Sequence, residues 1–479
     1  MTEQAKRAPD YEQGGTTPLE PPAARTTTHG HAPDFLPRPE LAPPGVWSFP
    51  TPTRARLDNG IDTVVFTLPG QHVISANLVL DIPLNAEDPD REGVATICAR
   101  VLDEGTRAHD GEEFAELLET EGAGFGVELS LAGLQAVLDV PASNLEPALQ
   151  LFAEAVREPT LGARDVNRHV QLRLAEIEQA QANSAQTASI AFRSAVFDEA
   201  SRASRMNGGE PETVARLDQD SVAAFHAAQF GPARATLILA GDFPTDPLPL
   251  VERCFRSWQN PHQQAVPTQA PSPNSRRLIL VDRPGAVQAD IRYGGFGTDR
   301  LDPRWSDITV AGYAMGGAFL SRLNAVLRED KGYTYGVRMN FMPLHVGGSF
   351  AVQGSFRTEV VVDALSITQD LIDVSGTPFT TREVDEAVAY LTGVSPLRYA
   401  TADGVADQAA TQVLAGLPDD YVDRSLALLR SVTPETATTA YTSLVRPDDL
   451  SLVVVGDAER LADPLRGLGF DDLVVVPAE

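Results

Sequence analysis

Residues 281–341 read VDRPGAVQADIRYGGFGTDRLDPRWSDITVAGYAMGGAFLSRLNAVLREDKGYTYGVRMNF, and they contain the most specific pattern in the chain. A strand-like segment is followed by a loop with Asp302-Pro303 and then by a helix-like segment. Beyond these segments the distinctive residues are Gly316, Gly317, Ser321, Arg322, Leu323, Leu327, Arg328, Glu329, Gly332 and Tyr335. Such a combination is far more specific than a lone glycine motif. The residues GGFG at 294–297 lack the dinucleotide-binding spacing, and we expect a turn there.

The rest of the chain repeats one pattern in two halves. Residues 230–243 read FGPARATLILAGDF, and residues 445–461 read VRPDDLSLVVVGDAERL. Each stretch has a polar turn, an apolar strand and then Gly-Asp, and each follows a helix-like segment. Both halves also open with a strand, a loop with Asp-Pro and a helix. Residues 260–277, NPHQQAVPTQAPSPNSRR, have the composition of an extended linker between the halves.

A duplication explains this repetition most economically. We therefore predict an α+β fold with two homologous domains, each of which is a sheet with helices on one face. The predicted division is a disordered Pro/Thr-rich tail at residues 1–45, an N-terminal domain at 46–258, a linker at 259–276 and a C-terminal domain at 277–479.

Composition limits the classes of function. The chain has 479 residues and a formal net charge of -28 at pH 7, which repels polyanions, so we expect neither nucleic acid nor a membrane surface as a partner. We find no apolar run long enough to span a bilayer and no secretory signal, and we therefore expect a cytoplasmic protein. The two cysteines are too few for a disulfide framework or a thiolate metal site.

The pattern in residues 281–341 closely resembles the C-terminal domain of the pitrilysin/insulinase-type metallopeptidases. This inverzincin group includes the mitochondrial processing peptidase and many bacterial two-chain enzymes. The duplicated halves, the linker and the two Gly-Asp strand ends fit the same family, so the resemblance extends over about residues 46–479. It implies two mitochondrial-processing-peptidase-like domains that together form one half of a clamshell.

An early helix of the first half is where this family carries its zinc motif. Residues 93–106 read GVATICARVLDEGT, and the apolar residues recur at the spacing of one buried helical stripe. Active relatives have His-x-x-Glu-His on this helix, in which both His bind Zn²⁺ and the Glu is the general base. The register set by the flanking glycines places Thr96, Ala99 and Arg100 at the three chemical positions.

None of these three residues keeps the chemistry of the motif. A Thr hydroxyl is a poor zinc ligand, Ala99 cannot accept a proton, and Arg100 puts a positive charge where the cation would sit. The resemblance aligns Glu176 with the third zinc ligand of active relatives and His169 with a further Glu seven residues upstream. For Glu176 we expect a solvated helix face or a salt bridge, for example to Arg100. We therefore predict no metal and no cofactor in this chain, with zinc in a partner subunit.

Arg328 and Tyr335 are the residues of the family pattern that do survive. In relatives, the resemblance implies, this Arg and Tyr reach the substrate that is bound at the zinc of the first domain. A guanidinium and a phenol can donate hydrogen bonds to a scissile carbonyl as it becomes an oxyanion, or to the peptide backbone. The alternative is that both side chains only brace the helix and the loop that follows it.

Three functions remain open on the sequence alone. The first is the zinc-free, substrate-binding subunit of a heterodimeric peptidase that cleaves peptides or small unfolded proteins in a closed chamber, together with a homologous zinc-bearing subunit. The second is a non-enzymatic scaffold or assembly protein derived from the same fold. The third is an independent enzyme with an atypical site, which would require bound metal in the isolated chain.

Overall fold

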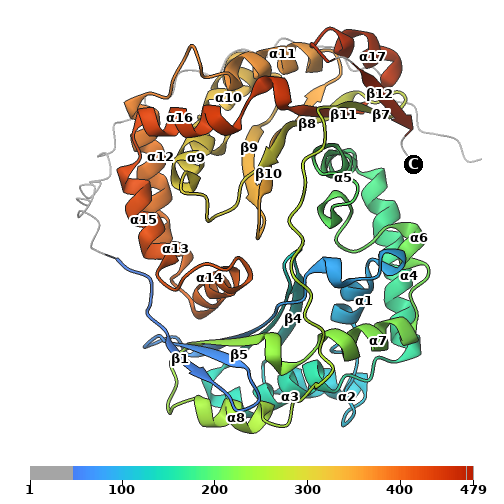
Figure 1. Cartoon of the computed structure of the whole chain (residues 1–479), viewed down its shortest axis with the longest axis vertical. Coiled ribbons are helices and arrows are strands. Elements are labelled where there is room, and N and C mark those ends of the chain that lie inside the picture. The colour runs from blue at the N-terminus through green and yellow to red at the C-terminus, as the bar shows by residue number, and fades with distance from the viewer. Residues whose placement is uncertain (1–46, 471, 478–479) are drawn as a thin grey trace, which may run out of the picture. The chain divides into compact units, whose positions relative to one another are not determined.

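Two six-stranded sheets with matching strand order organise the chain (Figure 1). The computed structural model describes residues 47–470 and 472–477, so the tail predicted at residues 1–45 lies outside the described residues. The first sheet has the order β1-β2-β6-β3-β5-β4, and the second has the order β12-β7-β11-β8-β10-β9. The strands are β1 (Thr53–Arg56), β2 (Asp62–Thr67), β3 (Val73–Leu80), β4 (Gly124–Leu129), β5 (Leu134–Pro141), β6 (Ala235–Gly241), β7 (Leu278–Asp282), β8 (Gln288–Gly297), β9 (Val337–Pro343), β10 (Gly348–Arg357), β11 (Ser451–Gly456) and β12 (Leu473–Pro477).

The internal pairing of the two sheets shows the duplication that the sequence predicts. In the first sheet β6 runs parallel to β2 and antiparallel to β3. In the second sheet β11 is parallel to β7 and antiparallel to β8. These two inserted strands carry the repeated Gly-Asp ends, Gly241-Asp242 and Gly456-Asp457. In the sequence, the strands of the first sheet precede the predicted linker at residues 259–276 and those of the second sheet follow it. The domain boundaries themselves stay a prediction.

Helices connect the strands along the chain and cover the faces of the sheets. In the first half they are α1 (Val94–Arg100), α2 (Gly111–Thr120), α3 (Leu145–Arg157), α4 (Ala163–Ala182), α5 (Ser184–Val196), α6 (Pro211–Val214), α7 (Gln219–Gln229) and α8 (Leu248–Phe255). In the second half they are α9 (Trp305–Gly312), α10 (Arg322–Asn324), α11 (Val361–Ile372), α12 (Thr381–Gly393), α13 (Ser395–Arg398), α14 (Ala402–Leu414), α15 (Tyr421–Ser431), α16 (Pro434–Leu444) and α17 (Ala458–Arg466). Among the described helices, none is both long and apolar enough to cross a bilayer.

Each half contributes one helix to the sheet of the other half. Most helices cover one face of their own sheet, as predicted, and form two large apolar cores. The opposite face of the first sheet receives α14, which packs on β3 and β6, and the corresponding face of the second sheet receives α5, which packs on β8 and β11. Figure 1 shows α14 beside the first sheet and α5 against the second. The apolar periodicity of the sequence predicts helices but not this exchange.

Polar residues at equivalent strand positions fix the exchanged helices. Asn77 of β3 donates to Asp407 of α14 at 2.8 Å, and Gln135 donates to the same carboxylate at 3.0 Å. At the matching register of β8, Arg292 donates to Ser189 of α5 at 3.0 Å. Because Asn77 is fully buried, its amide requires a partner from the incoming helix.

Loops also hold the starts of the exchanged helices. Arg283, which follows β7, donates to the carbonyl oxygens of Gln181 and Ala182 at 2.6 Å each, where α4 ends and α5 begins. In the other half Gln71, between β2 and β3, donates to the carbonyl of Ala400 at 3.1 Å, just before α14. In each case a side chain of one half therefore binds backbone carbonyls just before the helix that the other half contributes.

The GGFG segment at residues 294–297 is not a turn, so that prediction is wrong. It forms the end of the ten-residue strand β8, which pairs with β10 and β11. A Cβ atom at Gly294 would lie 1.9 Å from the carbonyl oxygen of Phe350. Glycine is needed there because the neighbouring backbone approaches too closely for a side chain.

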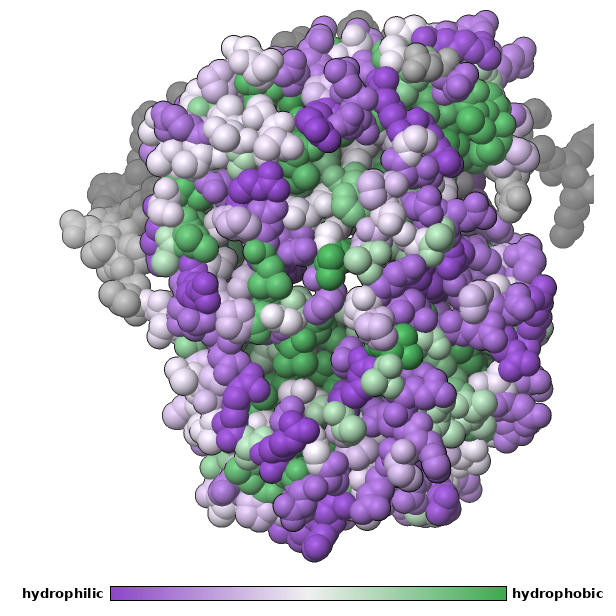
Figure 2. Space-filling model, viewed as in Figure 1, coloured by the Kyte–Doolittle hydropathy of each residue, from purple (hydrophilic) through white to green (hydrophobic). Residues whose placement is uncertain are grey.

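The surface agrees with the acidic, polar composition. Figure 2 shows hydrophilic residues over most of the visible face, with apolar side chains gathered near the edge strand β12. Val474 and Val475 of this strand are exposed. Isolated apolar patches of this kind are common on protein surfaces.

The contact between α14 and the first sheet gives a stability prediction. Asp407→Ala should reduce the free energy of unfolding by about 2 kcal/mol, because it leaves the buried amides of Asn77 and Gln135 without an acceptor. Asp403→Ala, at an exposed position of the same helix, should cost less than about 1 kcal/mol. Urea unfolding of both variants measures the difference, and equal effects would show that the buried amides do not depend on Asp407.

Candidate functional site

Helix α1 keeps the position that its apolar stripe predicts. All five stripe residues are buried in the first apolar core: Val94, Ile97, Cys98, Val101 and Leu102. The helix packs on α7, α4 and the edge strand β4. Of the three degenerate positions, Ala99 is buried, while Thr96 and Arg100 are half-buried. The apolar stripe therefore accounts for the packing of the helix.

An ion pair joins two of the residues that the sequence predicts at the zinc-ligand positions of the family. The two terminal nitrogens of Arg100 donate to the two carboxylate oxygens of Glu176 on α4, each at 2.9 Å. Arg173 approaches the same carboxylate at 3.3 Å. The hydrogen bonds from Arg100, with a smaller contribution from Arg173, lower the pKa of Glu176. The expected salt bridge between Glu176 and Arg100 is thus confirmed.

His169 is engaged in a second, separate ion-pair cluster. Its Nε2 lies 2.8 Å from a carboxylate oxygen of Glu104, and Arg168 lies 2.5 Å from the other oxygen. Burial raises the pKa of Glu104, but the hydrogen bonds from His169 and Arg168 outweigh burial and lower it overall. Within residues 47–470 and 472–477 we find no group of three or more His, Cys, Asp or Glu side chains that could hold a metal ion. The absence of zinc from the chain stays a prediction.

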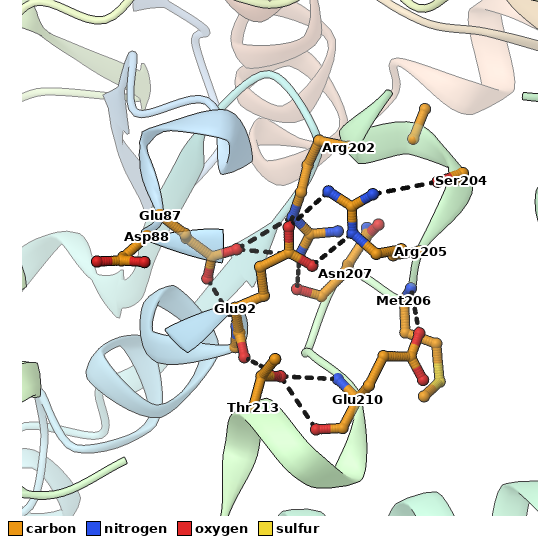
Figure 3. Close-up of polar contacts among 12 residues, drawn as sticks. Glu87, Asp88, Glu92, Arg202, Ser204, Arg205, Met206, Asn207, Glu210 and Thr213 are labelled. Carbon is orange, nitrogen blue, oxygen red and sulfur yellow. Dashed lines mark hydrogen bonds and ion pairs between the residues drawn. The ribbon is translucent and has the colours of Figure 1, made fainter. Parts of the chain in front are cut away.

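A buried carboxylate holds the start of α1 in place (Figure 3). One oxygen of Glu87 accepts hydrogen bonds from the backbone N–H groups of Gly93 and Ala95, each at 3.0 Å, and the other oxygen accepts from Arg202 at 2.9 Å. The side chain of Glu87 is 0% exposed. Burial raises its pKa, while Arg202 and the two amides oppose that shift. The interaction satisfies helix N–H groups that would otherwise lack partners.

A second pair extends this network. Glu92 is bound by Arg205 at 2.7 and 2.8 Å, and the Thr213 hydroxyl donates to its backbone carbonyl. Gly93, which directly follows Glu92, has a φ of 101°, and a Cβ there would lie 2.7 Å from the carbonyl oxygen of Gly208. The glycine that sets the motif register is therefore required by the backbone. Sequence reasoning missed this network because its acidic and basic members are more than 100 residues apart.

In the second half, Arg328 is held against a loop. It lies in a π-helical segment (Ala325–Asp330), where its Nη2 donates to the carbonyl of Phe319 at 3.0 Å and its Nε to Glu329 at 2.7 Å. The guanidinium also lies 3.7 Å from the centre of the Phe319 ring. Phe319 is itself 75% exposed. Arg328 thus braces the loop before α10.

Tyr335 has a different environment. Its side chain is fully exposed, with a relative accessibility of 101%. Among the described hydrogen bonds, none joins Tyr335 to Arg328, so the structure does not link the two predicted residues directly. The roles of Arg328 and Tyr335 in substrate binding stay predictions.

The neighbouring motif residues have structural roles. Arg322 forms a bidentate ion pair with Glu383 of α12, at 2.5 and 2.8 Å, and also donates to the carbonyls of Thr377 and Pro378. A Cβ at Gly316 would lie 2.4 Å from the backbone nitrogen of Met339 on β9. The motif therefore attaches the irregular segment before Arg328 to a helix on one side and to a strand on the other.

Comparisons with known proteins agree with this architecture. Residues 64–207 match the family described as Insulinase (Peptidase family M16), and residues 216–391 match the Peptidase M16 inactive domain. The chain is 22% identical to the non-peptidase homolog YmxG of Helicobacter pylori over 385 residues, which cover 78% of this chain and 86% of the relative. It is 24% identical to the uncharacterized zinc protease SCO5738 of Streptomyces coelicolor over 422 residues, which cover 86% of this chain and 90% of the relative.

Solved structures share the fold. The peptidase M16 inactive domain from Pseudomonas fluorescens superimposes with a TM-score of 0.79 at 22% identity, covering 85% of this chain and 98% of that chain. A chain of complex III from Candida albicans gives a TM-score of 0.73 at 15% identity, covering 86% of this chain and 98% of that chain.

The chain belongs to the M16, or insulinase-type, peptidase family. That Thr96, Ala99 and Arg100 occupy the positions of the family's inverted zinc motif stays a prediction. The predicted resemblance and the predicted α+β fold with two M16-type domains are both confirmed.

The Glu87 network predicts that α1 depends on one buried carboxylate. Glu87→Ala should lower the free energy of unfolding by about 3 kcal/mol, because it removes the nearer of two ion-pair partners of buried Arg202 and the acceptor of two helix amides. Asp90→Ala, which breaks an exposed pair with Arg216 in the same region, should cost less than about 1 kcal/mol. Denaturant unfolding compares the two variants, and a similar small loss in both would contradict the assigned role of Glu87.

The ion pair between Arg322 and Glu383 predicts a pH-dependent contribution to stability. Burial raises the pKa of Glu383, but hydrogen bonds from Arg322 and the Thr380 amide outweigh burial and bring it down from 4.5 to about 2. A carboxyl group with a depressed pKa stabilises the fold above its unfolded-state pKa, and this contribution disappears as pH falls from 4.5 to about 2. Glu383→Gln should therefore cost about 2 kcal/mol near neutral pH and progressively less below about pH 4.

The matched control for this pH dependence is Glu386→Gln in the same helix. Glu386 pairs with Arg382 through two exposed side chains, so its loss should cost no more than about 0.5 kcal/mol at any pH. Urea unfolding at several pH values gives both curves. A constant deficit for Glu383→Gln across the acidic range would be inconsistent with the lowered pKa.

Proposed function

We propose that this chain is the zinc-free, substrate-binding subunit of a two-chain metallopeptidase. The observation that carries the proposal is the bidentate ion pair between Arg100 and Glu176, which joins two positions of the family's metal site within an intact fold. A guanidinium at hydrogen-bond distance from that carboxylate disfavours a divalent cation there. Zinc and the general base then belong to a homologous partner with His-x-x-Glu-His.

Arg328 and Tyr335 are the groups by which this chain would contribute to the partner's reaction. The Tyr335 phenol is exposed and free to donate to a substrate. Arg328 uses Nε and Nη2 for its contacts with Glu329 and Phe319, which leaves Nη1 as a further donor. Its contacts also fix the guanidinium in one place, which is what electrostatic stabilisation of an oxyanion requires. Bracing the loop and binding substrate are therefore compatible roles.

The substrate would be an extended peptide or a small unfolded protein held in a chamber that the two chains enclose. Within the described residues β4 and β9 each form one edge of their sheet, opposite β1 and β12, so their free N–H and C=O groups are available for β-augmentation. Strand β4 lies against α1, which places one edge beside the former zinc helix. A cytoplasmic location remains part of this proposal.

A scaffold function is the second candidate. The fold also occurs in a chain of complex III, which supports a purely structural use of the same architecture. A scaffold would form a stable complex with a partner that is not a peptidase, and it would stimulate no peptide cleavage. The loss of ligating residues alone agrees with both candidates.

A reconstitution experiment distinguishes the two functions. The full chain is mixed with a homologue that carries His-x-x-Glu-His, and peptide cleavage is followed by fluorescence. Arg328→Ala or Tyr335→Phe should each reduce kcat/KM by about 10²-fold, as expected when one oxyanion donor is lost. Because the Tyr335 side chain is fully exposed, loss of its hydroxyl should not change stability.

The matched controls lie on α12. Arg382 and Tyr390 are exposed, as Tyr335 is, so Arg382→Ala and Tyr390→Phe should leave kcat/KM unchanged. Full activity of both the Arg328 and the Tyr335 variants would refute a role of this chain in the reaction. Failure of the wild-type chain to stimulate any zinc-bearing homologue would favour the scaffold.

A further inference from the structure

A cavity of about 380 Å³ lies between α5 and the strands β8, β9 and β10 of the second sheet. Its apolar walls include Leu129, Leu131, Phe192, Phe197, Met342 and Leu344. The polar lining consists of two arginines with hydroxyl and amide side chains, and contains no carboxylate: Ser189, Arg193, Asn207, Arg292, Ser349 and Gln353. Both the volume and the apolar character are typical of small-ligand sites.

Arg292 brings a buried positive charge to this cavity. The residue is 8% exposed, and its guanidinium donates to the carbonyls of Ile291 and Ala185, each at 2.7 Å, and to the Ser189 hydroxyl. Within the described part of the chain, no carboxylate lies within 4 Å of it. Burial lowers the pKa of Arg292, and Asp290 opposes this shift only from a distance, through its charge. The Asp290 carboxylate instead accepts a hydrogen bond from Ser355.

Arg193 supplies a second charge to the same cavity. Its Nε donates to the carbonyl of Ala203 at 3.0 Å, and its Nη2 donates to the side chain of Asn207 at 2.9 Å. It too lacks an ion-pair partner among the residues that the structure describes. Burial, together with the nearby charge of Arg202, lowers its pKa to about 10, which Glu210 opposes only through its charge, so the guanidinium is still protonated at neutral pH. All the partners of Arg193 and Arg292 are therefore neutral.

This arrangement differs from that of Arg202, a buried arginine of the first half. Arg202 is ion-paired with Glu87 and Glu92, as is usual for a buried charge. Two charges held in a largely apolar cavity with no described carboxylate in contact carry a desolvation cost that neutral acceptors only partly offset. Such a cost is understandable where a ligand supplies the missing negative charge.

We propose that this cavity binds a carboxylate that carries an apolar group, with Arg193 and Arg292 as the cationic ligands of that carboxylate. Guanidinium groups match the planar geometry of a carboxylate and bind it through charge-assisted hydrogen bonds. The apolar walls accommodate the attached side chain. In a peptide the carboxylate is either the C-terminus after an apolar residue or an acidic side chain beside one.

The proposal rests on the proposed function only in naming a peptide as the source of the carboxylate. The cavity is formed by this chain alone, so it is tested with the isolated full-length protein and without any peptidase assay. The probes are fluorescent pentapeptides ending in Ala-Ala-Phe: one with a free C-terminus, one amidated, and one amidated with Glu in place of the second Ala. Fluorescence anisotropy gives the dissociation constant of each.

The free-acid peptide should bind at least about tenfold more tightly than the amide, because only the free acid forms charge-assisted hydrogen bonds. Tight binding of the amidated Glu peptide alone would identify an acidic side chain as the source and would equally support the carboxylate site. Equal binding of all three peptides, or no binding of any, would overturn it.

Variants assign the binding to the cavity. Arg193→Gln and Arg292→Met should each weaken binding of the preferred peptide by about tenfold or more. Arg157→Met is the matched control, because Arg157 is also largely covered and bonded to backbone carbonyls but lies outside the cavity. Unchanged affinity in both cavity variants, or an equal loss in Arg157→Met, would overturn the proposal.

A cavity-filling variant keeps the test valid if Arg292→Met does not fold. Ala351 lines the cavity and is buried, so Ala351→Leu reduces its volume while both arginines remain. It should weaken peptide binding by about tenfold or more while retaining the native circular dichroism spectrum. Full affinity in Ala351→Leu would show that the peptide binds elsewhere. Failure of these binding tests would leave stimulation of a zinc-bearing partner unaffected, so the two proposals are separable.

Discussion

The exchange of one helix between the two halves is the constraint on which the rest of the structure depends. A six-stranded sheet with helices on one face leaves a second face that must be covered, and neither half covers this face with its own helices alone. Helix α14 supplies small side chains, such as Ala406 and Ala410, that allow a close approach to the first sheet. Helix α5 covers the second sheet with Ala188, Phe192 and Ala195. Each half therefore completes the other.

The polar contacts of this exchange differ in a way that matters for function. At one strand position the first sheet has Asn77, a neutral group satisfied by Asp407. At the equivalent position the second sheet has Arg292, whose partners are all neutral. The first of these two related sheets therefore has a hydrogen-bonded amide at this position. The second has a guanidinium that contacts no described carboxylate and lines a cavity. Duplication preserves the scaffold while the chemistry of equivalent positions diverges.

Helix α1 shows that the position of a helix and the chemistry of its polar face are set by different residues. The place of α1 depends on its apolar stripe, on Gly93 and on the Glu87 carboxylate. None of these would contact a metal. The position of the helix therefore does not depend on Thr96, Ala99 or Arg100, the residues predicted at the motif positions, and the charge of Arg100 is neutralised by Glu176. A change of chemistry at these three positions does not require a change of fold.

Much of this architecture could be predicted from local sequence patterns. Period-3.6 spacing identified the stripe of α1, and two similar apolar strands with Gly-Asp ends identified the duplication. The partnership of Arg100 with Glu176 followed from the family register. The packing between distant segments could not be predicted from such patterns. The amphipathic patterns of α5 and α14 indicate that each helix has an apolar face, but not which sheet that face covers. The strand at residues 294–297 was misjudged because glycines that permit close backbone packing look like turn residues.

The central claim is that any catalysis by this protein depends on zinc held in another chain. The most direct measurement is the zinc content of the purified, isolated chain, taken together with its peptide-cleaving activity before and after addition of a zinc-bearing homologue. The account predicts well below about 0.1 zinc per isolated chain and no cleavage until the homologue is added. About one zinc per isolated chain, with cleavage that a chelator abolishes, would contradict it.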